Sequence, residues 1–188
     1  MTVMRHLPIL FFVLCLEGCL LFSSRQSEYR AASYESVAES ALILASYRAA
    51  DTLLAQADTR LSQQHPIIVA TLVDINALEE SSPLGRLLAE QLSARFAQQG
   101  YQVVELKIRR QLYMKRDEGE LMLSREVEEI VQRHEAQAFL VGTYAEGVDR
   151  VFINLKLTQI DSNITLAAVD YALPLDMNIR SLLYRKDQ

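Results

Sequence analysis

Carboxylates are the first residues in this sequence whose type and spacing could do chemistry. Glu79 and Glu80 are adjacent, and a second group lies in the run Asp117-Glu118-Gly119-Glu120. Two carboxylates can hydrolyse a glycosidic bond when one acts as the acid and the other as the base or nucleophile. Neighbouring charges in predicted loops are far more often solvated surface. We therefore expect both groups to be exposed and not catalytic.

The histidines and cysteines offer no metal site. His65 stands before a proline and His134 near the end of a predicted helix, and neither has a metal-binding residue at ligand spacing. Cys15 and Cys19 both lie near the N-terminus, so no disulfide framework can form in the rest of the chain. The sequence contains no glycine-rich phosphate loop, nucleophile elbow or zinc-protease motif. It therefore predicts no metal, no cofactor and no enzymatic activity.

Basic residues concentrate in one stretch of the chain. They are Lys107, Arg109, Arg110, Lys115 and Arg116. This stretch could contact phosphate-bearing lipid or an acidic partner, but acidic residues come directly after it, and a solvated edge is the favoured interpretation. The whole chain has a formal net charge of −5, which repels a phosphate backbone. No nucleic-acid partner is expected.

The first twenty residues predict export and lipid attachment. Arg5 precedes an apolar run over residues 7–16, which is shorter than the roughly twenty residues that cross a bilayer. A positive start, a short apolar run and a small residue at the exit are typical of a secretory signal. Leu16-Glu17-Gly18-Cys19 resembles the bacterial lipobox, although Glu17 stands where that pattern usually has a small neutral residue. We expect cleavage between Gly18 and Cys19 and anchoring through acyl chains on Cys19.

A cleaved soluble export signal and an uncleaved anchor are the alternatives to this interpretation. Cys15 is the poorer candidate for acylation because the bulky Leu14 precedes it. Leu20, and not an aspartate, comes directly after Cys19. This resembles lipoproteins that are sorted to the outer membrane, which would place the rest of the chain in the periplasm.

The sequence divides into five parts. Residues 1–18 are the expected signal peptide, and residues 19–32 are a tether. Residues 33–65 predict one long helix, because apolar residues recur at helical spacing and neither glycine nor proline interrupts them. His65-Pro66 should end this helix, and its alanine-rich face should pack against the main domain. Residues 66–175 form that domain, and residues 176–188 form a C-terminal tail.

The main domain alternates strands with helices. Strands are expected at residues 67–73, 101–108, 138–144, 151–157 and 164–173. Helices should begin at Ser82-Pro83 and at Ser124, with Gly100 ending the first of them, whereas residues 109–123 show only a turn at Gly119. This order predicts an α/β (α+β) fold: a small mixed β-sheet of about five strands with two helices packed on one face, preceded by one long N-terminal helix.

Two segments are specific enough to indicate a family. Ser82-Pro83-Leu84-Gly85-Arg86 opens the first domain helix, and Val141-Gly142-Thr143-Tyr144 closes the third strand. The other matching segments are Val69 to Asp74, Val103 to Leu106, Leu123 to Arg125, Val151 to Leu157 and Ala167 to Pro174. In this order they resemble the FlgO-type domain of bacterial outer-membrane lipoproteins that are associated with flagella. The resemblance runs from about Ile68 to Leu173.

The resemblance implies a structural role without catalysis. A protein of this kind would sit in the outer membrane, bind envelope or flagellar proteins, support flagellar assembly or motility, and could form a homo-oligomer. The candidate structural or interaction residues are Asp74, Ser82, Gly85, Arg86, Glu105, Arg125, Gly142 and Tyr144. Arg86 and Arg125 should pair with Asp74 or Glu105 or face a partner, and the ion pair is favoured. The two glycines should permit close packing of helix on sheet.

Two other functions stay open. A lipoprotein similar to the LpoB-like activators would regulate a cell-wall synthesis enzyme, but it would need a long tether, and residues 20–32 span at most about 45 Å when extended. A secretion-ring component similar to the CsgG class would need an amphipathic hairpin that enters a membrane, and residues 151–173 offer only core strands. For the favoured function, the alanine-rich helix face and an exposed sheet edge are the expected contact surfaces.

Overall fold

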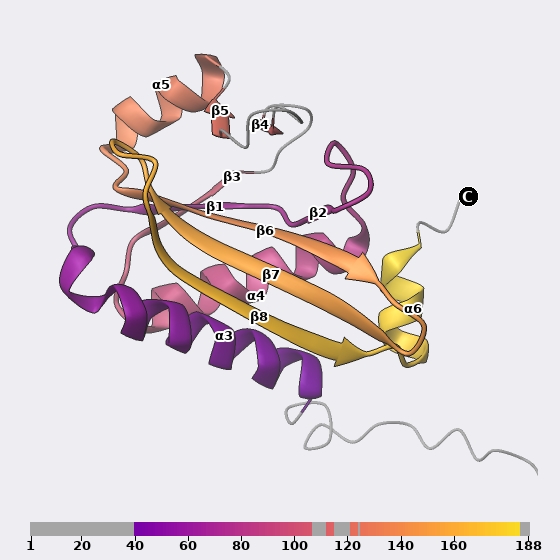
Figure 1. The fold of residues 1–188 in the computed structure, drawn as a ribbon. Helices are drawn as coiled ribbons and strands as arrows, with labels where there is room; N and C mark the ends of the chain where they lie inside the picture. The colour runs from indigo at the N-terminus through magenta and orange to yellow at the C-terminus, as the bar shows by residue number, and fades with distance from the viewer. Residues whose placement is uncertain (1–39, 107–111, 115–120, 124, 185–188) are drawn as a thin grey trace, which may run out of the picture. The chain divides into compact units, whose positions relative to one another are not determined.

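A computed structural model describes residues 40–106, 112–114, 121–123 and 125–184 (Figure 1). The chain falls into two compact units, Met1–Val37 and Ala38–Gln188, and all described residues belong to the second. Its elements are α3 (Ala41–Ala57), the 3₁₀ turn η1 (Asp58–Arg60), β1 (Ile67–Ala70), β2 (Val73–Asp74), α4 (Pro83–Gln98), β3 (Val103–Leu106), β4 (Leu112–Met114), β5 (Leu121–Leu123), α5 (Arg125–His134), β6 (Ala138–Glu146), β7 (Arg150–Gln159), β8 (Thr165–Pro174) and α6 (Met177–Leu183).

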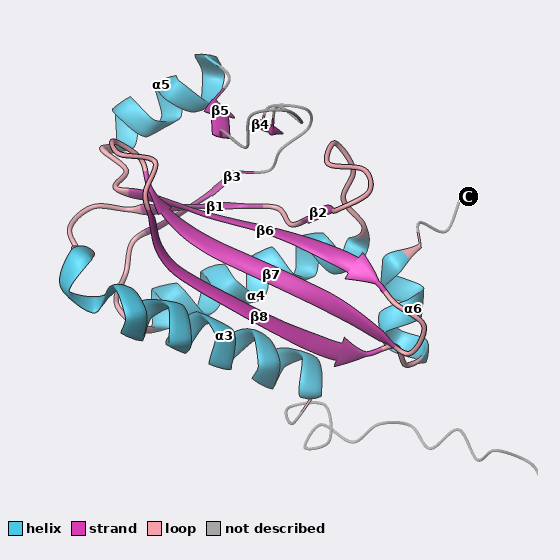
Figure 2. Cartoon of the chain, viewed as in Figure 1, coloured by secondary structure: helices cyan, strands magenta, loops and turns pink. Residues whose placement is uncertain are grey.

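Six strands form one mixed sheet (Figure 2). Its order is β3-β1-β6-β7-β8, and β2 pairs with β6 beyond the end of β1. The strands β3, β1 and β6 are parallel, whereas β6, β7 and β8 are antiparallel neighbours. The predicted mixed fold with helices packed on a sheet is confirmed. The sixth strand arises because the expected strand over residues 67–73 divides into β1 and β2.

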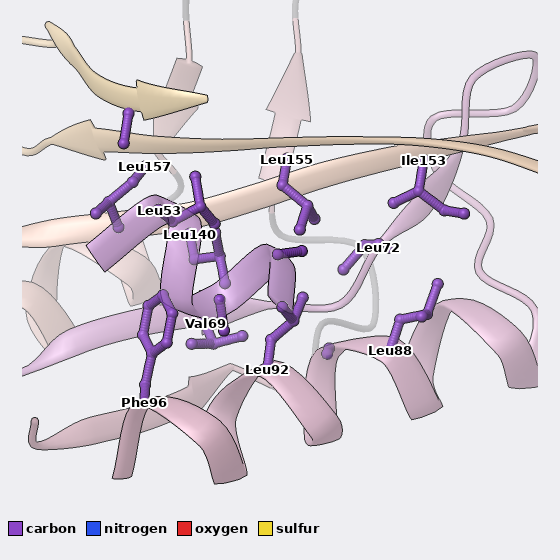
Figure 3. Close-up of a cluster of buried hydrophobic side chains, with 14 of the residues drawn as sticks. Leu53, Val69, Leu72, Leu88, Leu92, Phe96, Leu140, Ile153, Leu155 and Leu157 are labelled. Carbon is purple, nitrogen blue, oxygen red and sulfur yellow. The ribbon is translucent and has the colours of Figure 1, made fainter. Parts of the chain in front are cut away.

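The main core lies between the sheet and the helices α3 and α4, which cover one face. Every second residue of β7 from Val151 to Leu157 is buried, as the alternation of side chains along a strand requires. Figure 3 shows Leu53 of α3 and Leu92 of α4 directed toward Leu155 and its neighbours. This face therefore holds most of the buried apolar surface.

The helix α5 lies on the opposite face of the sheet, so the prediction that the helices share one face is wrong. A second, smaller core forms there from Ile68, Leu106, Val127 and Phe139. The physical reason is in β1, where every residue from Ile67 to Ala70 is buried. A strand that is apolar on both faces needs cover on both.

The helix α3 ends at Ala57 and does not continue to His65 as expected. After η1, Leu61 has extended backbone angles. The Gln137 side chain accepts a hydrogen bond from the Ser62 N–H at 2.8 Å and donates to the carbonyls of Ser62 and His65. These contacts satisfy backbone groups that a longer helix would have used itself, and they place the chain for its entry into β1.

Residues 176–188 include a helix, where the sequence indicated only a tail. Asp176 caps α6 by accepting a hydrogen bond from the Ile179 N–H at 2.8 Å. Ile179 is buried in the main core, and α6 packs against α4. The short helix was missed because a single buried residue in seven gives no detectable periodicity.

Several sequence features are found where they were expected. Ser82 caps α4, and Gly100 has a positive φ of 86° after its end. The stretch without a clear pattern contains the antiparallel pair β4 and β5. Cys19, all five basic residues of the basic stretch and the acidic run Asp117-Glu118-Gly119-Glu120 lie outside the described residues. None of the described helices combines the length and the apolar character needed to cross a membrane.

Candidate interaction surface at the Gly85–Gly142 junction

The two segments that carry the family resemblance meet in space. The Ser82 hydroxyl caps α4 by accepting a hydrogen bond from the Gly85 N–H at 3.2 Å. The Ser82 N–H in turn donates to the hydroxyl of Tyr144, near the end of β6, at 2.9 Å. Both Ser82 and Tyr144 are buried. A hydrogen bond across 62 residues therefore fixes the start of α4 on the end of β6.

Gly85 permits an approach between helix and sheet that no other residue would allow. A Cβ atom at this position would lie 2.3 Å from the carbonyl oxygen of Leu72 and 2.9 Å from Cε1 of Tyr144. Both distances are shorter than any real Cβ contact, and the Leu72 oxygen belongs to the backbone, which cannot rotate away. The expected role of Gly85 in close helix–sheet packing is in agreement with this geometry.

Gly142 makes the matching close approach within the sheet. A Cβ atom here would lie 2.7 Å from Cδ2 of Leu155 on β7 and 2.9 Å from Cγ of Leu72. Leu72 is fully buried, with Leu155 and Leu140 close by in the same cluster (Figure 3). Gly85 and Gly142 thus both make room for Leu72. We call Leu72, Ser82, Gly85, Gly142 and Tyr144 the Gly85–Gly142 junction.

The junction holds the loop of residues 75–81, which joins β2 to α4, by hydrogen bonds at both ends. The Ile75 N–H donates to the Tyr144 carbonyl at 3.0 Å, and the Ser81 hydroxyl donates to the Leu72 carbonyl at 2.7 Å. Asp74 closes a tight turn, because its carboxylate accepts from the Asn76 N–H at 2.8 Å. The Asp74 N–H also donates across the loop to the Glu80 carbonyl at 3.0 Å. The loop is consequently fixed before any partner arrives.

Polar and apolar side chains project from this fixed loop. Ile75 is 54% exposed, and Asn76, Glu79, Glu80 and the neighbouring Arg86 are exposed as well. The prediction that Glu79 and Glu80 are solvated is therefore confirmed. An exposed apolar side chain beside charged ones, on a loop held by a rigid scaffold, is suited to binding another protein.

The structure brings six of the eight candidate residues to this region. They are Asp74, Ser82, Gly85, Arg86, Gly142 and Tyr144. Glu105 is exposed on β3 and Arg125 is exposed at the start of α5, away from the junction. Whether any of the eight takes part in function stays a prediction.

The ion pairs favoured for Arg86 and Arg125 with Asp74 or Glu105 are not formed among the described residues. Arg86 instead donates from Nη1 to the Ser81 carbonyl at 3.1 Å. The ion pairs among the described residues join Arg95 to Asp51 and Arg150 to Asp149. The described part of the chain also contains no cluster of histidine, cysteine and carboxylate side chains able to hold a metal ion.

A polar network between α3 and α4 was missed by the sequence analysis. Arg95 donates to both carboxylate oxygens of Asp51, at 2.8 and 2.9 Å, and Gln99 donates to the same carboxylate. Hydrogen bonding and charge from Arg95 hold the pKa of Asp51 below its usual value. The guanidinium also stacks over Tyr47, 5.4 Å from the ring centre. No local pattern could reveal this contact, because its partners are 44 residues apart.

A second polar site lies deeper, where α3 meets β8. The Ser46 hydroxyl donates to Oε1 of Gln91 at 2.8 Å and is fully buried. The hydroxyl of Tyr171 is buried nearby without a hydrogen-bond partner among the described residues. Burial raises the pKa of Tyr171 to about 12. Neither polar site has the arrangement of a nucleophile, base and cavity that catalysis needs.

Several solved structures are similar to this chain at low sequence identity. The C-terminal domain of LpoB from Salmonella enterica has 17% identity and a TM-score of 0.45, covering 68% of this chain and 93% of that one. PelC from Paraburkholderia phytofirmans, solved as a dodecamer, has 10% identity and a TM-score of 0.42, with 61% and 74% covered. Lipoprotein GNA1162 from Neisseria meningitidis has 17% identity and a TM-score of 0.37, with 60% and 82% covered.

At these scores the likenesses say nothing about what this chain binds. A search of curated protein sequences gives no match. The family model described as FlgO protein, in contrast, matches residues 47–178, which is well over half of the chain. This match contains both segments of the Gly85–Gly142 junction and nearly all of the described elements. The chain belongs to the FlgO protein family.

Proposed function

We propose that this protein is a non-enzymatic lipoprotein of the bacterial cell envelope that binds other proteins and supports flagellar assembly, stability or motility. Membership of the FlgO protein family is the observation that carries this proposal. The Gly85–Gly142 junction supports it, because the most specific family segments are used to build and hold an exposed loop and not a catalytic cleft.

The loop of residues 75–81 is the proposed contact surface for a protein partner. Its backbone is fixed because the Asp74 carboxylate and the Tyr144 carbonyl accept hydrogen bonds from loop N–H groups and the Ser81 hydroxyl donates to the Leu72 carbonyl, so little conformational entropy is lost when a partner binds. Ile75 would enter an apolar recess on the partner. Glu79 and Glu80 would face basic groups around that recess, which favours fast and specific association.

The proposed anchor is Cys19, acylated after cleavage behind Gly18. Two or more acyl chains give stable attachment, since each buried CH₂ contributes roughly 0.8 kcal/mol. Leu20 favours the outer membrane, and the folded unit would then lie in the periplasm. Metabolic labelling with radioactive palmitate tests this step. The wild-type protein should be labelled and Cys19→Ser should not, whereas equal labelling of both would refute acylation at Cys19.

The partner function is tested by deleting the gene and restoring it with defined variants. Swimming and filament number should fall in the deletion strain and recover with the wild-type gene. The double variant Ile75→Asp, Glu79→Lys should be made in normal amounts and fail to restore motility. Asp161→Lys, which is exposed at the β7–β8 turn away from the loop, is the matched control and should restore it.

Normal motility in the deletion strain would refute the flagellar role. The alternative role, regulation of a cell-wall synthesis enzyme, predicts that outcome together with sensitivity to inhibitors of wall synthesis. Recovery of motility with the loop variant would instead leave the flagellar role intact and remove the loop as the contact surface. The two parts of the proposal can therefore fail separately.

A further inference from the structure

One end of the folded unit collects four chain segments (Figure 1). They are the start of α3, the β6–β7 turn, the end of β8 and α6. The Leu175 N–H donates to the Asp149 carbonyl at 2.9 Å, and the Tyr184 hydroxyl donates to the Glu146 carboxylate at 2.7 Å, so the turn is tied to both sides of α6. We call this region the α6 end.

The helix α3 runs antiparallel to β8, which places its first residues at the α6 end. Near its C-terminus, Gln56 accepts a hydrogen bond from the Ala168 N–H, and Arg60 donates to the Leu166 carbonyl, both early in β8. Near its N-terminus, Ser46 lies close to Tyr171, late in β8. The start of α3 therefore lies toward the end of β8, at the same end of the sheet as α6 (Figure 1).

The α6 end exposes more large apolar side chains than any other described region. Val148, on the β6–β7 turn, is 97% exposed, and Met177, in the first turn of α6, is 82% exposed. Phe152, Tyr184 and Leu44 at the same end are exposed as well. Val148 and Met177 bury little of their apolar surface within the folded unit. Several exposed apolar side chains gathered at one end of a fold are typical of a site where a protein meets another apolar phase.

Among the described residues, the charges at the α6 end nearly cancel. Asp149 is paired with Arg150 at 2.8 Å, and Glu146 keeps its charge while it accepts a hydrogen bond from Tyr184. The exposed Asp176 and Arg180 carry opposite charges. A surface of this kind is not drawn to an anionic membrane by charge. It can nevertheless enter the boundary between headgroups and acyl chains through its apolar side chains.

The path of the chain indicates that this apolar phase is the lipid bilayer. The segment between Cys19 and Ala41 is at most about 75 Å long when fully extended, and it joins the folded unit at the α6 end. Acyl chains on Cys19 would therefore keep this end near the bilayer at a high local concentration, where even a weak contact is populated. The exposed side chains of Val148 and Met177 lie on a turn and at the start of a helix, and not on a continuous flat face.

We propose that the α6 end rests on the phospholipid surface, with Val148 and Met177 inserted below the headgroups. This inference rests on the proposed acylation of Cys19. It gives the anchored unit a defined orientation, so that it does not tumble freely at the end of its tether. The membrane contact is then a second attachment that does not depend on anionic lipid or on low salt.

Fluorescence quenching by lipid tests this orientation in the full-length, acylated protein. Acylation consumes the thiol of Cys19 and Cys15 leaves with the signal, so a cysteine introduced elsewhere is the only free thiol. Val148→Cys and Ile164→Cys are each labelled with an environment-sensitive fluorophore and reconstituted into vesicles of phosphatidylethanolamine and phosphatidylglycerol. Ile164 is the matched control, because it is exposed at the β7–β8 turn, at the other end of β8.

The fluorophore at position 148 should shift to shorter wavelength and lose most of its emission when brominated acyl chains are included. The fluorophore at position 164 should do neither, and high salt should change neither result. Met177→Asp should weaken the quenching at position 148 while palmitate labelling and membrane fractionation stay normal.

Emission from position 148 that is typical of water, in a protein that is fully acylated, would overturn the inference and leave the anchor intact. A blue shift without quenching by brominated lipid would also overturn it, since it would mean that a protein or a second copy of the chain covers this end. Loss of palmitate labelling, in contrast, would refute the anchor itself, so the two failures are distinguishable.

Discussion

The two faces of the sheet differ in how much apolar surface they bury. On one face, α3, α4 and α6 bury a large continuous core that includes Leu53, Leu92 and Leu155. On the other, α5 covers a small cluster around Phe139 and Ile68. The Gly85–Gly142 junction belongs to the first face, because Leu72 and Tyr144 are part of its core. Stability and the proposed contact loop should thus be coupled on one face, whereas we expect changes in α5 to have less effect on both.

The largest expected difference comes from shortening one apolar side chain of the helix that covers each face. Leu92→Ala on α4 should lower the free energy of unfolding by about 3 to 4 kcal/mol, because it leaves a cavity among fully buried residues. Ile130→Ala on α5 should lower it by only about 1 kcal/mol, since that side chain is half-buried. Urea unfolding of both variants measures the two losses. Equal losses would mean that the faces are not different in this respect.

Gly85→Ala places a methyl group inside the junction. We expect a loss of about 2 to 3 kcal/mol in the free energy of unfolding, because the new Cβ would lie 2.3 Å from a backbone oxygen. Helix propensity alone predicts the opposite, a gain of about 1 kcal/mol. The control Ala94→Gly, at an exposed position of α4, should cost about 1 kcal/mol. A stabilised Gly85→Ala variant would show that helix and sheet are not tightly packed here.

Tyr144→Phe removes one hydroxyl from the junction and leaves the packing in place. The buried Ser82 N–H would lose its acceptor, at a cost of about 1.5 kcal/mol in stability. Amide hydrogen exchange should also become faster in the loop of residues 75–81, because the start of α4 is held less firmly. An unchanged rate of amide exchange in the loop would refute the proposed coupling between the core face and the contact loop.

The smallest effect at neutral pH is expected from Tyr171→Phe. Burial raises the pKa of Tyr171 from 10.0 to about 12, so the folded state holds the proton more tightly than the unfolded state. The wild-type protein should therefore lose stability as the pH rises from 10 toward 12. Below pH 10 no loss of stability from this group is expected. Tyr171→Phe should remove that component of the alkaline loss. Thermal unfolding of both proteins across this pH range provides the measurement.

Much of the fold could be predicted because its information is local. The alternation of buried residues in β7, the cap at Ser82 and the positive φ at Gly100 each depend on a few neighbouring residues. The end of α3 could not be predicted in this way. It depends on Gln137, which is 75 residues away from Ser62, and no local pattern contains that contact.

The sequence identified several residues of the candidate site but not how they are arranged in space. Gly85 and Gly142 were recognised as packing residues, yet nothing in the sequence indicated that both make room for Leu72. An ion pair was expected for Arg86 because charge complementarity is visible in a sequence. The structure assigns Arg86 to the Ser81 carbonyl instead, an oxygen that lies five residues earlier, just before α4 begins.

The sequence by itself determined the secondary structure periods and the helix caps, because each is encoded in residues that are close along the chain. It also indicated the family, through segments that follow one another in a fixed order, and it predicts the attachment at Cys19. Only the tertiary structure decided that α5 covers the second face, that α6 joins the core, and that two distant segments form one junction. These features depend on burying apolar surface between elements, and that free energy arises only when segments far apart in sequence come into contact.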